Sequence, residues 1–246
     1  MSIAEVGSIP GIVRLERTTI ADVDLRQAEL SELAPSGCVF EKCDFRGVTF
    51  DRRTRPIFRA RERNVFHECR FDGVDLRAID PGASRFERCS FDRADITRWN
   101  VTTAEFVDCR FAGTVQDVRF YGRPWGPTAA TLEPPRAANE FRGNDFREAD
   151  LVRVAFLMGI DVRKQRWPES GDYVRLDRIH QRLTRARAGI LGWKDLEARN
   201  EALAMLRALS FLYVQQEEIV ARRVEPGTST PAEIQSRVWE ALAATL

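Results

Sequence analysis

A large apolar residue returns every five positions along most of residues 15 to 160, and this period limits the possible folds more than any other feature. It is clearest in five related strings: VFEKCDF (39–45), VFHECRF (65–71), RFERCSF (85–91), EFVDCRF (105–111) and EFRGNDF (140–146). A period of five fits neither the 3.6-residue period of a helix nor the two-residue period of a strand. It fits a square coil in which each pentapeptide forms one side and one turn.

The intervals between the strings support such a coil and predict where it is interrupted. Phe66, Phe86 and Phe106 follow one another at intervals of 20 residues, which is four pentapeptides. The interval from Phe40 to Phe66 is 26 residues, and the interval from Phe106 to Phe141 is 35. We therefore expect a stack of coils with two insertions, near residues 51–63 and 120–138.

Each large residue is preceded by a small residue two places earlier and often by an acidic one directly before it. The best examples are Ala28-Glu29-Leu30, Val74-Asp75-Leu76, Ala94-Asp95-Ile96, Asn144-Asp145-Phe146 and Ala149-Asp150-Leu151. This pattern resembles the repeat of the pentapeptide repeat proteins and extends over most of residues 15 to 165. The resemblance implies an all-β, right-handed quadrilateral β-helix, followed here by a C-terminal α-helical appendage.

The coil predicts which side chains form the core. The large inward residues are Phe40, Phe45, Phe66, Phe71, Phe86, Phe91, Phe106, Phe111, Phe141 and Phe146, and the small inward residues include Cys38, Cys43, Cys69, Cys89 and Cys109. Stacked coils lie close enough for a disulfide, so distance alone does not exclude one. We expect buried free thiols instead, because free cysteine behaves as a small hydrophobic residue.

The outward positions carry charge in regular columns. One column contains Asp22, Lys42, Glu68, Arg88 and Asp108, whose signs alternate from coil to coil. Neighbours of opposite sign on adjacent strands favour a self-neutralised surface over a binding stripe. An acidic column of Glu29, Asp75, Asp95 and Asp150 follows from the repeat itself and only weakly indicates a function.

The first insertion contains the strongest concentration of charge in the chain. Its arginines are Arg52, Arg53, Arg55, Arg59, Arg61 and Arg63, and only Asp51 and Glu62 oppose them locally. Arginine recognises phosphate and carboxylate groups with paired hydrogen bonds, so this insertion is a candidate partner-binding element. The alternative is an arginine-rich corner that pairs with acidic side chains on neighbouring coils.

The second insertion is rich in proline and carries Tyr121, Arg123 and Trp125. Proline prevents strand pairing, so we expect a projecting loop. An aromatic tip with an arginine is typical of a protein contact. The alternative is that Trp125 folds back as a lid on the coil beneath it.

The five-residue period stops near residue 160, and the remaining residues have a helical pattern. We divide the chain into a lead-in (1–14), a β-helix (15–165) and a helical region (166–246). We expect helices over 171–188 and 193–222, and a third that begins with a capping box at Thr230-Pro231-Ala232-Glu233. These helices are predicted to cap the open end of the solenoid or to form a homodimer.

No combination of residues predicts catalysis. His67 and His180 are the only histidines, no nucleotide-binding or metal-binding motif is present, and we expect no enzyme activity, cofactor or metal. The 38 basic and 37 acidic side chains leave a net charge of +1. We find neither a signal sequence nor a membrane span and expect a cytoplasmic protein.

The family resemblance implies a function that the charge only partly supports. The best-described pentapeptide repeat proteins bind type II topoisomerases such as DNA gyrase, compete with DNA, and protect the enzyme from quinolones or toxins. Residues 1 to 170 contain 27 basic and 27 acidic side chains, whereas DNA carries one negative charge per about 1.7 Å. Two alternatives are a protein interaction scaffold and a nucleic-acid binder that uses the arginine insertion together with Arg175, Arg178, Arg182 and Arg185.

Overall fold

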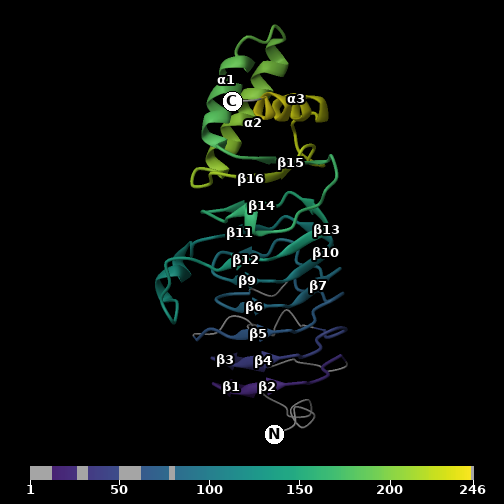
Figure 1. The fold of residues 1–246 in the computed structure, drawn as a ribbon, viewed down its shortest axis with the longest axis vertical. Coiled ribbons are helices and arrows are strands. Elements are labelled where there is room, and N and C mark those ends of the chain that lie inside the picture. Colours follow the sequence, from purple (N-terminus) through teal and green to yellow (C-terminus); the bar gives the residue numbers. More distant parts are fainter. Residues whose placement is uncertain (1–12, 27–32, 50–61, 78–80, 245–246) are drawn as a thin grey trace.

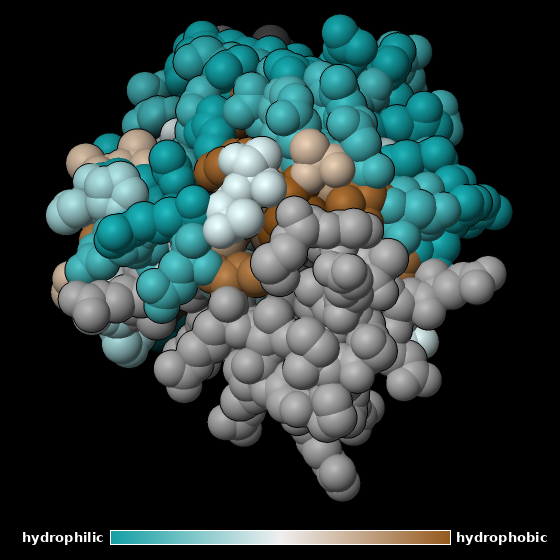
Figure 2. All heavy atoms as spheres, turned by 90° about the horizontal axis from the view of Figure 1, so that it is seen from below, coloured by the Kyte–Doolittle hydropathy of each residue, from teal (hydrophilic) through white to brown (hydrophobic). Residues whose placement is uncertain are grey.

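The computed structural model describes residues 13–26, 33–49, 62–77 and 81–244. The molecule is a rod of stacked coils with the N-terminus at one end and the helical region at the other (Figure 1). Along the rod axis, seen from the N-terminal end, hydrophilic residues cover most of the visible described surface, and a small apolar group is visible near the centre (Figure 2). No helix in the described residues is long and apolar enough to cross a membrane.

The largest sheet stacks one strand from each coil in the order β12-β9-β6-β5-β4-β2, and all its pairs are parallel. Its strands are β2 (Thr19–Ala21), β4 (Val39–Glu41), β5 (Val65–His67), β6 (Arg85–Glu87), β9 (Glu105–Val107) and β12 (Phe141–Arg142). The register places Phe40 beside Phe66, and the same pairing continues through Phe86 and Phe106 to Phe141. The register is therefore the one that the intervals between the repeats predict.

The other sides of the coils form smaller parallel sheets. One contains β7 (Ser90–Asp92), β10 (Arg110–Gln116) and β13 (Asp145–Val152), and another contains β8 (Asn100–Val101), β11 (Arg119–Tyr121) and β14 (Ala155–Leu157). Strand β1 (Val13–Glu16) pairs with β3 (Leu33–Ser36), and a parallel bridge joins Asp75 to Asp95. Parallel sheets on successive sides of the coil are what a solenoid requires; its right-handed, closed quadrilateral form stays a prediction.

Two columns of stacked phenylalanine rings fill the interior of the rod. Ring centroids lie 4.8 Å apart between Phe40 and Phe66 and 5.1 Å apart between Phe66 and Phe86. The second column includes the pair Phe45 and Phe71, at 4.7 Å. Every phenylalanine expected in the core is buried. Offset stacking of this kind adds to the free energy gained by burying the rings.

The cysteines lie beside these columns as buried free thiols, as the sequence predicts. Each thiol donates to a backbone carbonyl of the coil before it; Cys89 Sγ lies 3.2 Å from the carbonyl oxygen of Phe66. Burial raises the pKa of the Cys89 thiol, so it stays protonated. The thiols act as small packing groups.

The C-terminal region contains three helices and one antiparallel pair of strands. The helices are α1 (Ile179–Ile190), α2 (Leu196–Leu212) and α3 (Ala232–Ala243), and the strands are β15 (Tyr173–Leu176) and β16 (Ile219–Arg222). This region has its own core, which reaches Ala155 and Leu157 of the last coil. The helices and the strand pair therefore pack on the C-terminal end of the rod (Figure 1).

Three expectations for this region are wrong. Residues 173–176 form a strand, so α1 begins only at Ile179, and the helix expected over 193–222 ends at Leu212. The apolar residues at 173–176 and 219–222 pair across the chain in a contact that local periodicity does not reveal. The capping box is also absent, because Pro231 is the N-cap residue and no side chain caps α3. The boundary between residues 165 and 166 stays a proposal; Trp167 stacks on Phe146 of the rod.

Two short 3-10 helices complete the structure: η2 (Pro127–Thr131) and η3 (Val162–Lys164). The first lies in the second insertion, which projects from the rod near β9 and β12 (Figure 1).

Candidate protein-binding surface

Most of the arginine-rich insertion lies outside the described residues. Arg52, Arg53, Arg55, Arg59 and Arg61 belong to this part, and the structure places only Arg63. The Arg63 guanidinium donates to Glu105 Oε2 at 2.6 Å. The end of the insertion is therefore tied to β9, two coils beyond β5, the strand that follows Arg63.

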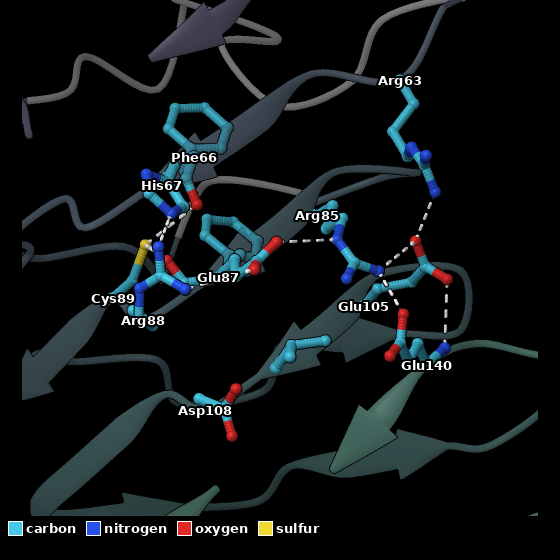
Figure 3. A network of polar contacts seen from close by, with 12 residues as sticks. Arg63, Phe66, His67, Arg85, Glu87, Arg88, Cys89, Glu105, Asp108 and Glu140 are labelled. Atoms are coloured by element: carbon cyan, nitrogen blue, oxygen red, sulfur yellow. Dashed lines mark hydrogen bonds and ion pairs between the residues drawn. The ribbon is translucent and has the colours of Figure 1, made fainter. Parts of the chain in front are cut away.

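Glu105 is a buried carboxylate at the centre of a cluster of charges (Figure 3). Only 4% of the residue is exposed, and its carboxylate lies within 3.6 Å of both Arg85 and Arg136 in addition to Arg63. Its Oε1 atom also accepts a hydrogen bond from the backbone N–H of Glu140 at 3.0 Å. A buried carboxylate needs such partners, because an unpaired buried charge is strongly destabilising.

Arg136 joins the second insertion to this cluster. Its guanidinium donates to the carbonyl of Thr103 and, at 3.2 Å, to Asn139 Oδ1. Its Nη1 atom is buried and has no hydrogen-bond partner among the described residues. Burial lowers the pKa of Arg136 from its usual value, and the nearby Glu105 carboxylate counteracts this effect.

The two insertions also touch through their backbones. The N–H of Arg63 donates to the carbonyl of Glu133 at 3.3 Å, and a parallel bridge joins Glu62 to Glu133. Together with Glu105, these contacts hold the end of the first insertion and the base of the second in one arrangement. Glu62 and Arg63 of the first insertion and residues 123–136 of the second thus lie in one composite surface, which we call the insertion platform.

The aromatic candidates of the second insertion differ in position. Trp125 is 54% exposed and does not form a lid on the coil, and Arg123 beside it is also exposed. Tyr121 lies in β11 and is half-buried against the core of the helical region, so the expectation that it is an exposed aromatic residue is wrong. Its position follows from the packing of the helices on the rod, which its own repeat does not reveal. Trp125 and Arg123 stay candidates for partner binding.

Repeated local pairs neutralise much of the charge on the rod. An aspartate directly before a large inward residue binds the arginine directly after it, as in Asp24 and Arg26 or Asp44 and Arg46. The hydrogen bonds from Arg26 lower the pKa of Asp24 to about 2. In the acidic column, Arg77 bridges Asp75 and Asp95 at 2.7 and 3.1 Å. The described part of this column is therefore largely paired.

The mixed-charge column lies at left-handed turns. All five members have φ between 52° and 56°, a backbone conformation that residues other than glycine seldom adopt. Glu68 and Arg88 form the expected contact between coils, at 2.9 Å, whereas Asp108 approaches Arg142 at 3.5 Å. Both the backbone and the charges support a structural role.

The arginines near α1 do not form the single stripe that the sequence suggests. Arg175 lies in β15, and Arg178 precedes α1 in a left-handed conformation. Arg182 is turned to Asp177, at 2.7 Å, and to the carbonyl of Leu242. These contacts remove much of the support for a nucleic-acid surface in the tail.

The cluster around Glu105 could not be recognised in the sequence. Glu105 and Arg85 occupy the same repeat position as the half-exposed Val39 and Val65. Glu105 is buried because the end of the second insertion passes over it and places Arg136 against its carboxylate. The one signal is the unusual interval of 35 residues before Phe141.

The comparison with curated proteins agrees with the repeat and the parallel coils. A stretch of 119 residues is 34% identical to the pentapeptide repeat protein MfpA of Mycobacterium tuberculosis (strain ATCC 25618 / H37Rv). The chain is similar to the pentapeptide repeat proteins. The match covers 45% of this chain and 54% of the relative, so this chain spans about half the length of that relative.

Two further comparisons add little to this resemblance. No protein-family model matches the chain. Among solved structures, the chain matches a trypsin-treated variant of QnrB1, a plasmid-mediated fluoroquinolone resistance protein, with 17% identity and a TM-score of 0.30. That match covers 72% of this chain and 90% of the other.

Proposed function

We propose that this chain is a non-enzymatic pentapeptide repeat protein that binds a type II topoisomerase, such as DNA gyrase, and confers resistance to an antibiotic or toxin that acts on that enzyme. The rod is then a right-handed quadrilateral β-helix. The observation that carries the proposal is the stack of parallel coils in a chain of which 119 residues are 34% identical to a pentapeptide repeat protein. The best-described members of that family bind type II topoisomerases in place of DNA.

The insertion platform is the proposed contact surface. A partner binds with less loss of conformational entropy when the surface is already ordered, and Glu105 holds Arg63 and Arg136 in place. Trp125 supplies an exposed aromatic ring, which is the side-chain type most often found at the centre of protein interfaces. The proposed contact surface also includes five arginines of the first insertion: Arg52, Arg53, Arg55, Arg59 and Arg61.

The near-neutral charge of the rod affects which of its features a topoisomerase can recognise. Pairs such as Asp24 with Arg26 and Asp75 with Arg77 cancel charge locally, so the described surface carries no long acidic stripe like that of DNA. We infer that shape and the insertions supply most of the recognition.

A supercoiling assay tests the proposal. Purified protein is titrated into DNA gyrase with and without a gyrase poison, and the predicted result is inhibition of supercoiling, or protection from the poison, at a low molar ratio. The variant Trp125→Ser should weaken the effect, whereas Leu191→Ser, which also replaces an exposed apolar residue but in the tail, should leave it unchanged. Absence of any effect at a large molar excess contradicts the proposal for gyrase.

A protein interaction scaffold is the second candidate function. It is favoured by Phe211 and Val214, which are large, exposed apolar residues of the tail. A homodimer through the helical region stays a prediction, and sedimentation of the full chain over a range of concentrations tests it. Direct nucleic-acid binding now depends mainly on the first insertion.

A further inference from the structure

A groove runs between α1 and α2 on the helical region. It has a volume of about 810 Å³, and its walls include Leu183 and Thr184 from α1 and Leu203, Leu206 and Ser210 from α2. Such a volume is within the usual range for binding pockets. The groove is separate from the insertion platform.

The end of the groove is lined by large apolar residues that the chain itself leaves uncovered. Phe211 is 76% exposed and Val214 is 63% exposed, and both line the groove. Isolated exposed apolar residues are ordinary, but a hollow apolar surface with adjacent exposed side chains is typical of an interaction site. The floor of the groove, formed by Leu183 and Leu206, is apolar as well.

The charged residues that line the groove have one sign. Arg187 of α1 and Arg207 of α2 lie along it, His180 adds a polar group, and no acidic residue is among its lining residues in the described chain. Neither arginine forms an ion pair with a described carboxylate, in contrast to Arg182, which binds Asp177. The groove therefore combines an apolar floor with two unpaired cations.

We propose that the groove between α1 and α2 binds an amphipathic helix of another protein, with an apolar stripe for the floor and acidic residues for Arg187 and Arg207. Helices recognised in this way place apolar residues at i, i+3, i+4 and i+7. The lining residues of the second wall within α2 run from Asn200 to Phe211, which at 1.5 Å per residue spans about 17 Å, or about three helical turns.

A second copy of this chain fits the groove less well. Symmetric pairing of two grooves would bring Arg187 and Arg207 of one copy against the same residues of the other. Like charges in a contact oppose association. The site does not depend on topoisomerase binding, and a failure of either proposal leaves the other intact.

The test uses two fluorescein-labelled helical peptides of about 18 residues that share one leucine stripe. One carries glutamate beside the stripe and the other carries lysine at the same positions. Fluorescence anisotropy with the full chain should show saturable binding of the glutamate peptide and at least about tenfold weaker binding of the lysine peptide. Equal binding of both, or binding of neither, overturns the proposal.

Variants locate the site. Phe211→Ser should weaken binding of the glutamate peptide by about tenfold or more, and the double variant Arg187→Glu with Arg207→Glu should reverse the preference between the peptides. Leu191→Ser is the matched control, because Leu191 is exposed but does not line the groove. A concentration-dependent dimer that Phe211→Ser abolishes would show that a second copy occupies the groove, and would overturn the proposal.

Discussion

At the scale of single residues, the stability of the rod depends on side chains that stack from coil to coil. Phe86 is fully buried, and its ring lies 5.1 Å from the rings of both Phe66 and Phe106. Removing it breaks both stacking contacts and the edge-to-face contacts with Phe71 and Phe91, and it leaves a cavity that neighbouring coils, fixed by their sheet pairing, cannot fill.

The variant Phe86→Ala should therefore lower the free energy of unfolding by about 3 to 5 kcal/mol. Urea unfolding followed by circular dichroism measures this change. Phe211→Ala is the control and should be close to neutral, because that ring is exposed. A loss below about 1 kcal/mol for Phe86→Ala would show that the ring is not part of a close-packed column.

Glu105 provides a second test at this scale. Replacing it with glutamine removes the carboxylate that the half-buried Arg136 and Arg63 share, so Glu105→Gln should destabilise the protein by about 3 to 5 kcal/mol, although Arg85 keeps Glu87 and Glu140 as partners. Glu148→Gln removes an exposed partner of Arg110 and should cost at most about 1 kcal/mol. Equal effects of the two variants in thermal unfolding would contradict the role of Glu105.

The local aspartate–arginine pairs predict that the stability of the fold depends on pH. Because Arg26 lowers the pKa of Asp24 to about 2 from an unfolded value near 3.8, the pair stabilises the fold above that unfolded value. The contribution is lost as the pH falls through about 2. Arg26→Ala should move the pKa of Asp24 back toward 3.8, which a carbon-detected NMR titration measures. An unchanged pKa would mean that these hydrogen bonds are not formed in solution.

The residues of the core were predictable, but those of the site were mostly not. The five-residue period identifies Phe40 and Cys69 as inward residues because each position repeats in every coil. Glu105 sits in an ordinary repeat position and becomes buried only because a segment more than 30 residues away returns over it. A local pattern contains no information about such a return.

At the scale of elements, the helical region covers the last coil. Ala155 and Leu157 of β14 belong to the same core as α1, α2 and α3, and Tyr173 of β15 accepts a hydrogen bond from the Leu151 N–H at 2.9 Å. Sequence reasoning predicted that helices follow the repeat near residue 160, but not β15 and β16. Each of these strands is four residues long and depends on its distant partner.

Removal of residues 171–246 should make the rod aggregate, because it exposes the apolar residues of β14 and an unpaired strand edge. Light scattering during thermal ramps measures this. The full chain under the same conditions is the control, and a truncated chain that stays soluble with an unchanged unfolding temperature would contradict the covering role of the helices.

At the scale of the whole molecule, the shape resembles a rod but the charge does not resemble that of DNA. Residues 1 to 170 have equal numbers of basic and acidic side chains, and the structure pairs many of them with each other. Binding of duplex DNA to a protein weakens steeply with salt because counterions are released from the phosphates. A neutral rod that binds to the DNA-binding surface of an enzyme should therefore lose much less affinity than DNA does as the salt concentration rises.

The most direct test of the central claim is a competition experiment on DNA gyrase. Labelled protein is bound to the enzyme at several salt concentrations, and unlabelled duplex DNA is then added. The proposed function predicts that the protein binds, that DNA displaces it, and that its affinity changes much less with salt than that of DNA does. Lack of binding to gyrase, or simultaneous binding of protein and DNA without competition, would contradict the claim that the rod takes the place of DNA.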